Sequence, residues 1–458
     1  MRIGSAYWAT ATNRGSLQPV FQLMRSSDLV NWHLAGAVFT NPPRWATESW
    51  WAPHLVFRGA SVLLYYSAKR RGQEGRCIGV ASAPRPRGPW RDQGPVVCSP
   101  GKPLDPTTVQ DERGRSYLVY KADFALRARR LSVDGTAVVG GERILLRADQ
   151  PWENGLVEAP QIVRRGRTYT LLYSGAACCG KTCTYALGAA QSGSPLGPYR
   201  KLDTNPILQS SRLWRCPGHA GAVTDDRGAT WLLYHAYPSR GIGYVARQTL
   251  LDRLRWRSGV PVVGRDRDPS LVAAAPAGAQ RRVRVQRDDF LGGRLSAMWQ
   301  WEEDRRPGTK VAGGTLGLVP RRSAPGRRER LFFGTTPTAA FTAETSVVGG
   351  AGGIGAYWTP AEAVGIERVG DRVRTWQRRR GRSRVVGSVA IPGPRVSLRL
   401  SGRYNRFTLA ASPDGRSWRP VGPAYSASVT DEWAFGTGLA LTAAAPSRFE
   451  WVAVRSSR

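Results

Sequence analysis

The sequence predicts an all-β protein, a five-bladed β-propeller followed by a β-sandwich. Three observations support this: a strand motif that recurs through the first half, short apolar runs, and a change of periodicity after residue 272. The apolar runs are interrupted by Gly, Pro, Asp and Asn, as in strands joined by turns. A length of 458 residues exceeds what one core usually holds, so two domains are expected.

The recurring motif ends in a tyrosine and is typical of the second strand of a propeller blade. Its copies are SVLLYYS, SYLVYK, YTLLYS and WLLYH, which end near Tyr66, Tyr120, Tyr173 and Tyr234, and a weaker copy, YWATAT, begins at Tyr7. A strand and a glycine turn precede each full copy, and another strand follows, in the last unit at GYVARQT. Units of about 50 residues with four strands are propeller blades. Residues 1–272 should therefore form five blades.

The second half has a different pattern. Residues 273–285 are rich in Pro, Ala and Gly and are expected to be a linker. Residues 286–458 alternate strands with glycine-rich turns, as in FTAETSVVG, YNRFTLAASPDGRSW and FEWVAVR. This alternation predicts a β-sandwich.

The net charge of +34 comes almost entirely from arginine. A nucleic-acid or polyanion binder can have this charge, but the arginines are scattered over turns and strand ends and no nucleic-acid motif is present. A solvated basic surface is therefore the favoured interpretation, and neither nucleic acid nor membrane is expected as a partner. No apolar segment has the length of a membrane span, and the chain opens in strand-like sequence rather than in a signal peptide.

The cysteines leave two interpretations open. They are Cys77, Cys98, Cys178, Cys179, Cys183 and Cys216. An even number allows three disulfides, which are typical of an oxidising compartment, but free buried thiols fit the sequence equally well. The spacing of Cys178, Cys179 and Cys183 does not match a zinc site.

The first strand of each predicted blade carries a polar residue toward the central channel. These residues are His54, Asp105, Glu158 and His219, with Asp105 and Glu158 expected at equivalent positions of neighbouring blades. Glu158 in VEAPQIV is the most informative, because a carboxylate is costly to bury and the nearby proline cannot donate to a sheet ladder. Structural roles remain open for Asp105 as a strand cap and for the two histidines.

Two tryptophans adjoin the second blade's first strand. Trp50 and Trp51 either belong to the core or form a stacking platform for a sugar ring. Together with two carboxylates in one wet pocket, a platform would suit glycoside hydrolysis. There one carboxylic acid protonates the leaving oxygen, a second group activates water, and a nearby charge raises the pKa of the acid.

The ordered motifs resemble glycoside hydrolase family 43, a family of five-bladed propellers. The matching stretches in residues 1–272 are WAPHLV, PLDPTTVQDERGRSYLVY, VEAPQIVRRGRTYTLLYSG and PGHAGAVTDDRGATWLLYHAY. Residues 288–458 resemble the concanavalin A-like sandwich, a jelly roll, that follows many members of the family, including β-xylosidases. The resemblance implies an inverting, secreted glycosidase of the α-L-arabinofuranosidase or β-xylosidase type that acts on plant polysaccharide.

The resemblance also assigns roles to individual residues. It implies that Glu158 is the general acid and that Asp105 raises the pKa of this acid and orients the substrate. His219 corresponds to a histidine beside a bound calcium, usually reached through water. Trp50, Trp51 and His54 are then candidates for substrate binding.

One element of the family pattern is missing. The family's general base is an aspartate at the start of the first blade, and no acidic residue precedes Asp28 here. We expect either that this sequence begins inside a longer gene or that the base has been lost. A non-catalytic carbohydrate-binding propeller is therefore the alternative function. The sequence does not indicate the oligomeric state.

Overall fold

The computed structural model describes residues 1–457 apart from Ala274, 281–284, Asp304, 321–327, 335–336 and 429–434. The described residues form strands and two short 3₁₀ turns, η1 (Pro151–Glu153) and η2 (Pro276–Gly278). The chain divides into two compact units, Met1–Ser239 with Gln248–Arg281 and Arg240–Arg247 with Arg282–Arg458. Part of the expected linker, Ala274 and 281–284, lies outside the described residues. Helices with the length and hydropathy of a membrane span are absent from the described part of the chain.

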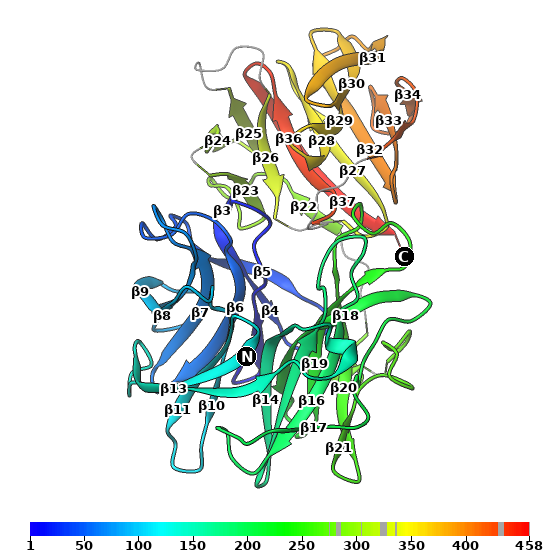
Figure 1. Ribbon diagram of the computed structural model, residues 1–458. Coiled ribbons are helices and arrows are strands. Elements are labelled where there is room, and N and C mark those ends of the chain that lie inside the picture. Colours follow the sequence, from blue (N-terminus) through cyan, green and yellow to red (C-terminus); the bar gives the residue numbers. More distant parts are fainter. Residues whose placement is uncertain are drawn as a thin grey trace. The chain divides into compact units, whose positions relative to one another are not determined.

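The described part of the first unit contains five four-stranded sheets, each with its strands in chain order (Figure 1). The first sheet is β1 (Arg2–Ile3), β2 (Ala6–Ala9), β4 (Val20–Ser26) and β5 (His33–Phe39), with β3 (Leu17–Gln18) between β2 and β4 in the chain. The second is β6 (Trp51–Arg58), β7 (Ser61–Lys69), β8 (Arg76–Ala83) and β9 (Arg91–Cys98), and the third is β10 (Leu104–Gln110), β11 (Ser116–Ala122), β12 (Ala125–Leu131) and β13 (Val138–Arg147). The fourth is β14 (Val157–Arg165), β15 (Thr168–Gly175), β16 (Ala186–Ser192) and β17 (Arg200–Lys201), and the fifth is β18 (Trp214–Thr224), β19 (Thr230–Pro238), β20 (Gln248–Arg257) and β21 (Val260–Val262). The predicted five-bladed propeller is confirmed.

One predicted strand of the fifth blade is wrong. The stretch GYVARQT was expected as the third strand, but β20 begins only at Gln248, and Arg240–Arg247 belongs to the second unit. Two glycines with left-handed backbones, Gly241 at φ 82° and Gly243 at φ 96°, turn the chain here. Glycine adopts this conformation without steric cost, so the strand starts after the turn.

The repeated tyrosines lie on the second strands and are buried, as the repeat predicts. Each one donates a hydrogen bond from its hydroxyl to a carboxylate. The pairs are Tyr66 with Asp92 at 2.8 Å, Tyr120 with Glu142, Tyr173 with Glu153 at 2.7 Å, and Tyr234 with Asp252 at 2.6 Å. The repeat therefore preserves a pair of a tyrosine and a carboxylate as well as an apolar strand.

Apolar clusters join each blade to the next and close the ring. Clusters of buried side chains connect the first and second, second and third, third and fourth, and fourth and fifth sheets. A further cluster of Tyr7, Leu29 and Trp231 joins the first sheet to the fifth. Contiguous burial of this kind is what holds blades together as one domain.

The second unit is a β-sandwich, as predicted. One sheet has the order β24 (Gly308–Ala312), β25 (Thr315–Val319), β37 (Ser447–Ser457), β27 (Ala340–Val347), β32 (Val396–Arg403), β33 (Arg406–Ser412) and β34 (Arg419–Pro420), with β22 (Val285–Asp288) beside β37 and β35 (Tyr425–Ser426) beside β33. The other includes β23 (Trp299–Glu302), β26 (Glu329–Phe333), β36 (Gly438–Ala443), β28 (Gly352–Thr359), β29 (Glu362–Val369), β30 (Arg372–Arg379) and β31 (Arg382–Ala390). Inward side chains of both sheets, such as Phe449 and Ile354, share an apolar cluster.

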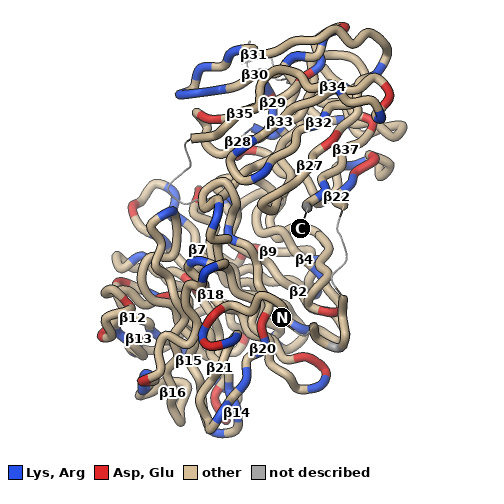
Figure 2. The backbone as a smooth tube through the Cα atoms, turned by 90° about the vertical axis from the view of Figure 1, so that its right-hand side faces the viewer, with Lys and Arg blue, Asp and Glu red and all other residues tan. Residues whose placement is uncertain are grey.

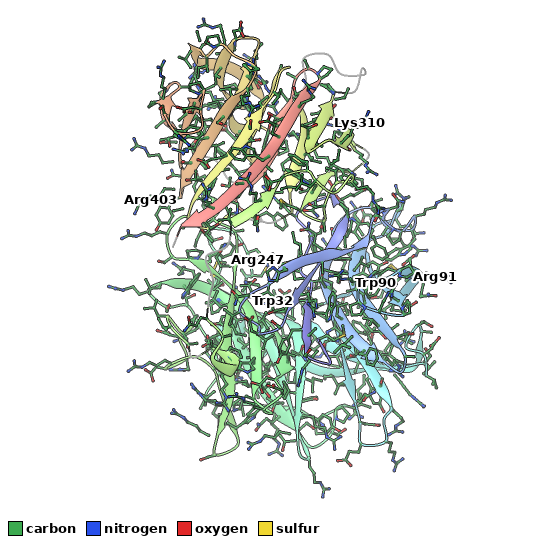
Figure 3. The ribbon with its side chains drawn as sticks, turned by 180° about the vertical axis from the view of Figure 1, so that it is seen from behind. Trp32, Trp90, Arg91, Arg247, Lys310 and Arg403 are labelled. Atoms are coloured by element: carbon green, nitrogen blue, oxygen red, sulfur yellow. A yellow bond between two sulfur atoms is a disulfide. The ribbon has the colours of Figure 1, made fainter. Side chains whose placement is uncertain are left out.

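The basic residues are distributed as a solvated surface. Figure 2 shows Lys and Arg spread over both units with Asp and Glu among them. Arg91, Lys310 and Arg403, which Figure 3 labels, are all exposed. This distribution agrees with the interpretation that the charge is not concentrated in one binding stripe.

All six cysteines lie among the described residues and form three disulfides, Cys77–Cys98, Cys178–Cys179 and Cys183–Cys216. The first joins residues directly opposite each other on β8 and β9. The other two lie on or beside the loop between β15 and β16. Of the two interpretations of the cysteines, the disulfides are therefore confirmed and the free thiols are not.

Candidate active site

The inner strands of the second to fifth blades share a β-bulge, on β14 next to Glu158. On β14, three steps from Glu158 to Gln161 face only two steps on β15, from Ser174 to Leu172. The same excess of one residue occurs between Trp51 and His54 on β6, Leu104 and Thr107 on β10, and Gly218 and Gly221 on β18. A bulge interrupts the ladder, which is why a proline is tolerated here, and it can redirect the adjacent side chain.

A residue inside each of these bulges has a left-handed backbone. The φ angles are 48° at Ala52, 55° at Asp105, 53° at Ala159 and 51° at His219. For residues other than glycine this conformation costs roughly 1–2 kcal/mol, so it needs support. Three of the amides donate to a hydroxyl of the preceding blade: Ala52 to Thr12 at 3.0 Å, Asp105 to Ser67 at 3.2 Å, and His219 to Ser174 at 2.9 Å.

Between the third and fourth blades, Asp105 replaces this hydroxyl. The position on β11 that corresponds to these serines is Lys121, whose ammonium group cannot accept a hydrogen bond. The amide of Ala159 donates instead to Oδ2 of Asp105 at 3.0 Å. Asp105 is thus equivalent to Ala159 and not to Glu158. The expectation that the two carboxylates occupy equivalent positions is wrong by one residue, although the hydrogen bond does bring them together.

Glu158 is half-buried and has a strongly altered acidity. The pKa of its carboxyl is raised from 4.5 to about 7, first by burial and then by the negative charge of Asp105. The charge of Lys121, a hydrogen bond from Tyr185 and the charge of His219 counteract part of this effect. Near neutral pH the carboxyl therefore holds its proton in part of the molecules, as a general acid must.

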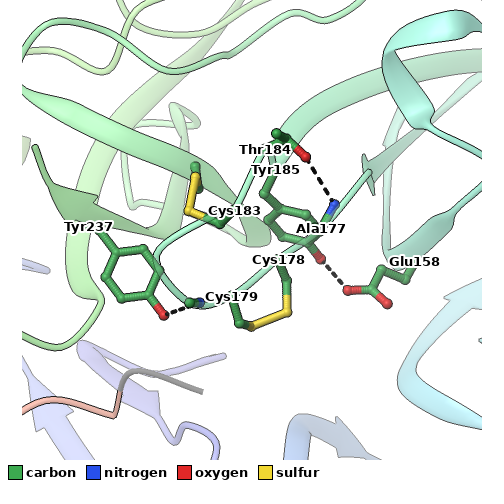
Figure 4. Close-up of a disulfide and its surroundings, with 10 residues drawn as sticks. Glu158, Ala177, Cys178, Cys179, Cys183, Thr184, Tyr185 and Tyr237 are labelled. Atoms are coloured by element: carbon green, nitrogen blue, oxygen red, sulfur yellow. Dashed lines mark hydrogen bonds between the residues drawn. A yellow bond between two sulfur atoms is a disulfide. The ribbon is translucent and has the colours of Figure 1, made fainter. Parts of the chain in front are cut away.

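Tyr185 is a functional candidate that sequence reasoning missed. Its hydroxyl donates to Oε1 of Glu158 at 2.8 Å (Figure 4), and burial raises the pKa of this phenol well above its usual range. Its ring stacks on His235, with centroids 5.7 Å apart and planes at 4°. A Cβ at Gly218 would lie 2.4 Å from this ring, so a glycine is needed there. The repeat did not indicate Tyr185 because this residue precedes β16 and does not lie on an inner strand.

Trp50 does not contribute to the expected platform, whereas the assignment of Trp51 to substrate binding stays a prediction. Trp50 has no exposed surface and packs against Phe21 and Tyr66, so its assignment to substrate binding is wrong. Trp51 is half-buried at the bulge, and the guanidinium of Arg76 lies 4.4 Å from the centre of its ring. The guanidinium covers one of the two faces of the ring.

The two histidines have different surroundings. His54 lies beyond the bulge and its Nε2 is 3.1 Å from the hydroxyl of Thr108. Burial lowers the pKa of His54 to about 3, so it is neutral, and these contacts support a structural role. His219 lies near Glu158, since its charge lowers the pKa of that carboxyl.

The described residues show no site for a directly coordinated calcium, and a calcium reached through water beside His219 stays a prediction. They contain no group of three His, Cys, Asp or Glu side chains that could hold a metal ion. Calcium prefers six to eight oxygen ligands, and His219 offers a ring nitrogen. We therefore derive no catalytic step through calcium.

A substitution at Tyr185 tests the hydrogen bond to Glu158. Tyr185→Phe keeps the ring on His235 but removes a donor that lowers the pKa of Glu158. We expect the alkaline limb of the pH profile of kcat/KM to move to higher pH, with a change of less than about threefold at pH 6. An unchanged limb would contradict the proposed contact.

Two extracellular enzymes are similar to this chain in sequence. An extracellular endo-α-(1→5)-L-arabinanase of Bacillus subtilis (strain 168) is 26% identical over 279 residues, which cover 56% of this chain and 84% of the arabinanase. An extracellular exo-α-(1→5)-L-arabinofuranosidase of Cellvibrio japonicus (strain Ueda107) is 28% identical over 277 residues, covering 53% of this chain and 79% of that enzyme.

The fold is also found among solved structures. The family 43 protein BlXynB of Bacillus licheniformis superposes with a TM-score of 0.85 at 19% identity, covering 100% of this chain and 96% of that protein. A xylan β-1,4-xylosidase of Bacillus halodurans has a TM-score of 0.79 at 18% identity, with 99% and 97% covered. Residues 1–261 match the model of the glycosyl hydrolases family 43. The match spans more than half of the sequence, and the chain belongs to glycosyl hydrolase family 43.

Proposed function

We propose that this chain hydrolyses arabinofuranosyl or xylosyl linkages of plant polysaccharides with inversion, and that Glu158 is the general acid. The observation that carries the proposal is the Glu158 carboxyl, whose pKa is about 7 beside the fixed carboxylate of Asp105. A group with this pKa can give a proton near neutral pH. Membership of family 43 supports inverting glycoside hydrolysis as the reaction.

The proposed reaction has two coupled proton transfers. Glu158 gives its proton to the glycosidic oxygen as the bond to the anomeric carbon breaks. Water attacks this carbon from the opposite face and passes a proton to a base, which inverts the configuration. Asp105 favours the protonated form of Glu158 before the reaction and is the candidate for orienting the sugar. We assign the base to no residue of this chain.

The names of similar proteins support the proposed class of substrate. Two of them are named for arabinan linkages, and a neighbour with the same fold is named for xylan. Because the identities are low, these names support pentose-containing polysaccharides as a class and do not select one linkage.

A panel of nitrophenyl glycosides tests the proposal. We expect turnover of the α-L-arabinofuranoside or the β-D-xyloside and none of the hexosides. Absent turnover, calorimetric binding of arabino- or xylo-oligosaccharides would favour the carbohydrate-binding alternative. If the chain neither hydrolyses nor binds any pentoside, the proposal is overturned.

We propose that the protein acts outside the cell. Two relatives are named extracellular, and pairing of all six cysteines suits an oxidising compartment. Recovery of the protein from cell lysate but not from the culture fluid of its source would contradict this localisation.

A further inference from the structure

A loop between β15 and β16 leaves and rejoins the fourth blade beside Glu158. Ser174, which pairs with Glu158, lies one residue before the end of β15. Tyr185, which donates to Glu158, immediately precedes β16. Residues 176–184 are therefore attached at both ends to direct neighbours of the general acid.

This loop is held in a defined shape. Cys183 forms a disulfide with Cys216 on β18, three positions before His219. The amide of Gly180 donates to the hydroxyl of Tyr237 at 3.5 Å, and the amide of Thr184 donates to the carbonyl of Ala177 at 2.9 Å. A wall fixed in this way can contact a ligand without a large loss of conformational entropy on binding.

The loop carries a disulfide between adjacent residues, Cys178 and Cys179. Both residues are partly exposed, whereas the other disulfide of the loop is buried. Figure 4 shows the Cys178–Cys179 disulfide between the side chains of Tyr237 and Glu158 in that view. The bond closes a small ring with the backbone and presents carbon and polarisable sulfur without a strong hydrogen-bond donor.

An apolar surface beside Glu158 would suit a sugar. A sugar ring presents a face of C–H groups, and carbohydrate sites usually cover it with an apolar group. Here Trp50 is buried in the core and Trp51 lies under Arg76. We propose that the Cys178–Cys179 disulfide is a wall of the substrate site and packs on the apolar face of the pentose bound at Glu158. This inference rests on the proposed function.

Calorimetry tests the contact. Arabino- and xylo-oligosaccharides are titrated into the full chain carrying Glu158→Gln, which slows hydrolysis, with and without Cys178→Ala/Cys179→Ala. We expect Kd to rise about five- to twentyfold when the disulfide is removed, as for the loss of one or two buried apolar groups. Cys77→Ala/Cys98→Ala is the control for loss of a disulfide as such, and we expect its Kd to stay within about twofold.

A second measurement separates direct contact from an indirect effect through Tyr185. In proteins that retain Glu158, the pH dependence of the thermal midpoint between pH 4.5 and about 7 reports the acidity of this carboxyl. If the disulfide contacts the sugar, Cys178→Ala/Cys179→Ala leaves this dependence unchanged. A change like that of Tyr185→Phe, or an unchanged Kd, overturns the inference while the proposed function stands. If the chain with its disulfide binds no pentose oligosaccharide, both are overturned.

Discussion

Replacing Glu158 with glutamine is expected to lower kcat/KM on an oligosaccharide by about 10²- to 10⁴-fold, the usual contribution of a general acid. The variant is a close match in shape. Its amide oxygen can still accept the hydrogen bond that Tyr185 donates at 2.8 Å, so the loss comes from the missing proton.

The leaving group provides an internal control for this role. Nitrophenolate is stable as an anion and needs little protonation, whereas a sugar alkoxide needs a full proton transfer. The loss on Glu158→Gln should therefore be much smaller for a nitrophenyl glycoside than for an oligosaccharide with the same terminal sugar. Equal losses on both substrates would contradict a general-acid role and would favour a role of Glu158 on the water side of the reaction.

Ionisation of Glu158 should also lower the free energy of unfolding, and this effect can be measured without turnover. Because the carboxyl has a pKa of about 7 in the folded protein against 4.5 ordinarily, the folded state binds more protons between these values. The free energy of unfolding must then fall as the pH rises through this window. The fall is about 3 kcal/mol at most, and less because part of the side chain is exposed to solvent.

The matched comparison is again Glu158→Gln. Glutamine does not titrate, so the variant should gain about 1–3 kcal/mol over the natural chain at pH 8 but not at pH 4. The thermal midpoints of the propeller at the two pH values check this. A difference that does not depend on pH would mean that the pKa of Glu158 is not raised.

The blades could be predicted because their repeat is local. Each copy places a tyrosine, an apolar strand and a glycine turn within about 20 residues. The structure adds a reason for the tyrosine, a carboxylate partner such as Asp92 for Tyr66 and Asp252 for Tyr234. A buried hydroxyl needs such a partner, so strand and partner recur together.

The site was only partly predictable because it depends on a bulge and on contacts distant in the sequence. The order of motifs pointed to Glu158 and Asp105, but not to the one-residue offset between them, which appears only when the strands are paired. Tyr185 and Glu158 are 27 positions apart, and no periodicity links them. Trp50 and Trp51 are adjacent, but Trp50 precedes β6 and is fully buried, whereas Trp51 begins this strand and is partly exposed.

Replacing Asp105 with asparagine is expected to lower kcat/KM at pH 7 by about 10- to 100-fold and to move the alkaline limb of its pH profile to lower pH. The negative charge of Asp105 raises the pKa of Glu158, so its removal lets this pKa fall toward 4.5. A smaller fraction of molecules then carries the catalytic proton at neutral pH. The limb should move in the opposite direction to that in Tyr185→Phe, because the tyrosine lowers the same pKa.

Asp105→Ala separates the electrostatic role of Asp105 from its structural role. Asparagine keeps an oxygen for the amide of Ala159, which donates to Asp105 at 3.0 Å, whereas alanine leaves this amide buried without that acceptor. We therefore expect Asp105→Ala to be less stable than Asp105→Asn by about 1–3 kcal/mol while both show the shifted limb. If the limb moved only in the alanine variant, the pKa of Glu158 would depend on the shape of the bulge. A shift in both variants means that the charge of Asp105 contributes to the acidity of Glu158 in addition to burial. Asp105, whose oxygen supports a strained backbone where the other blades use a hydroxyl, then also controls the catalytic proton.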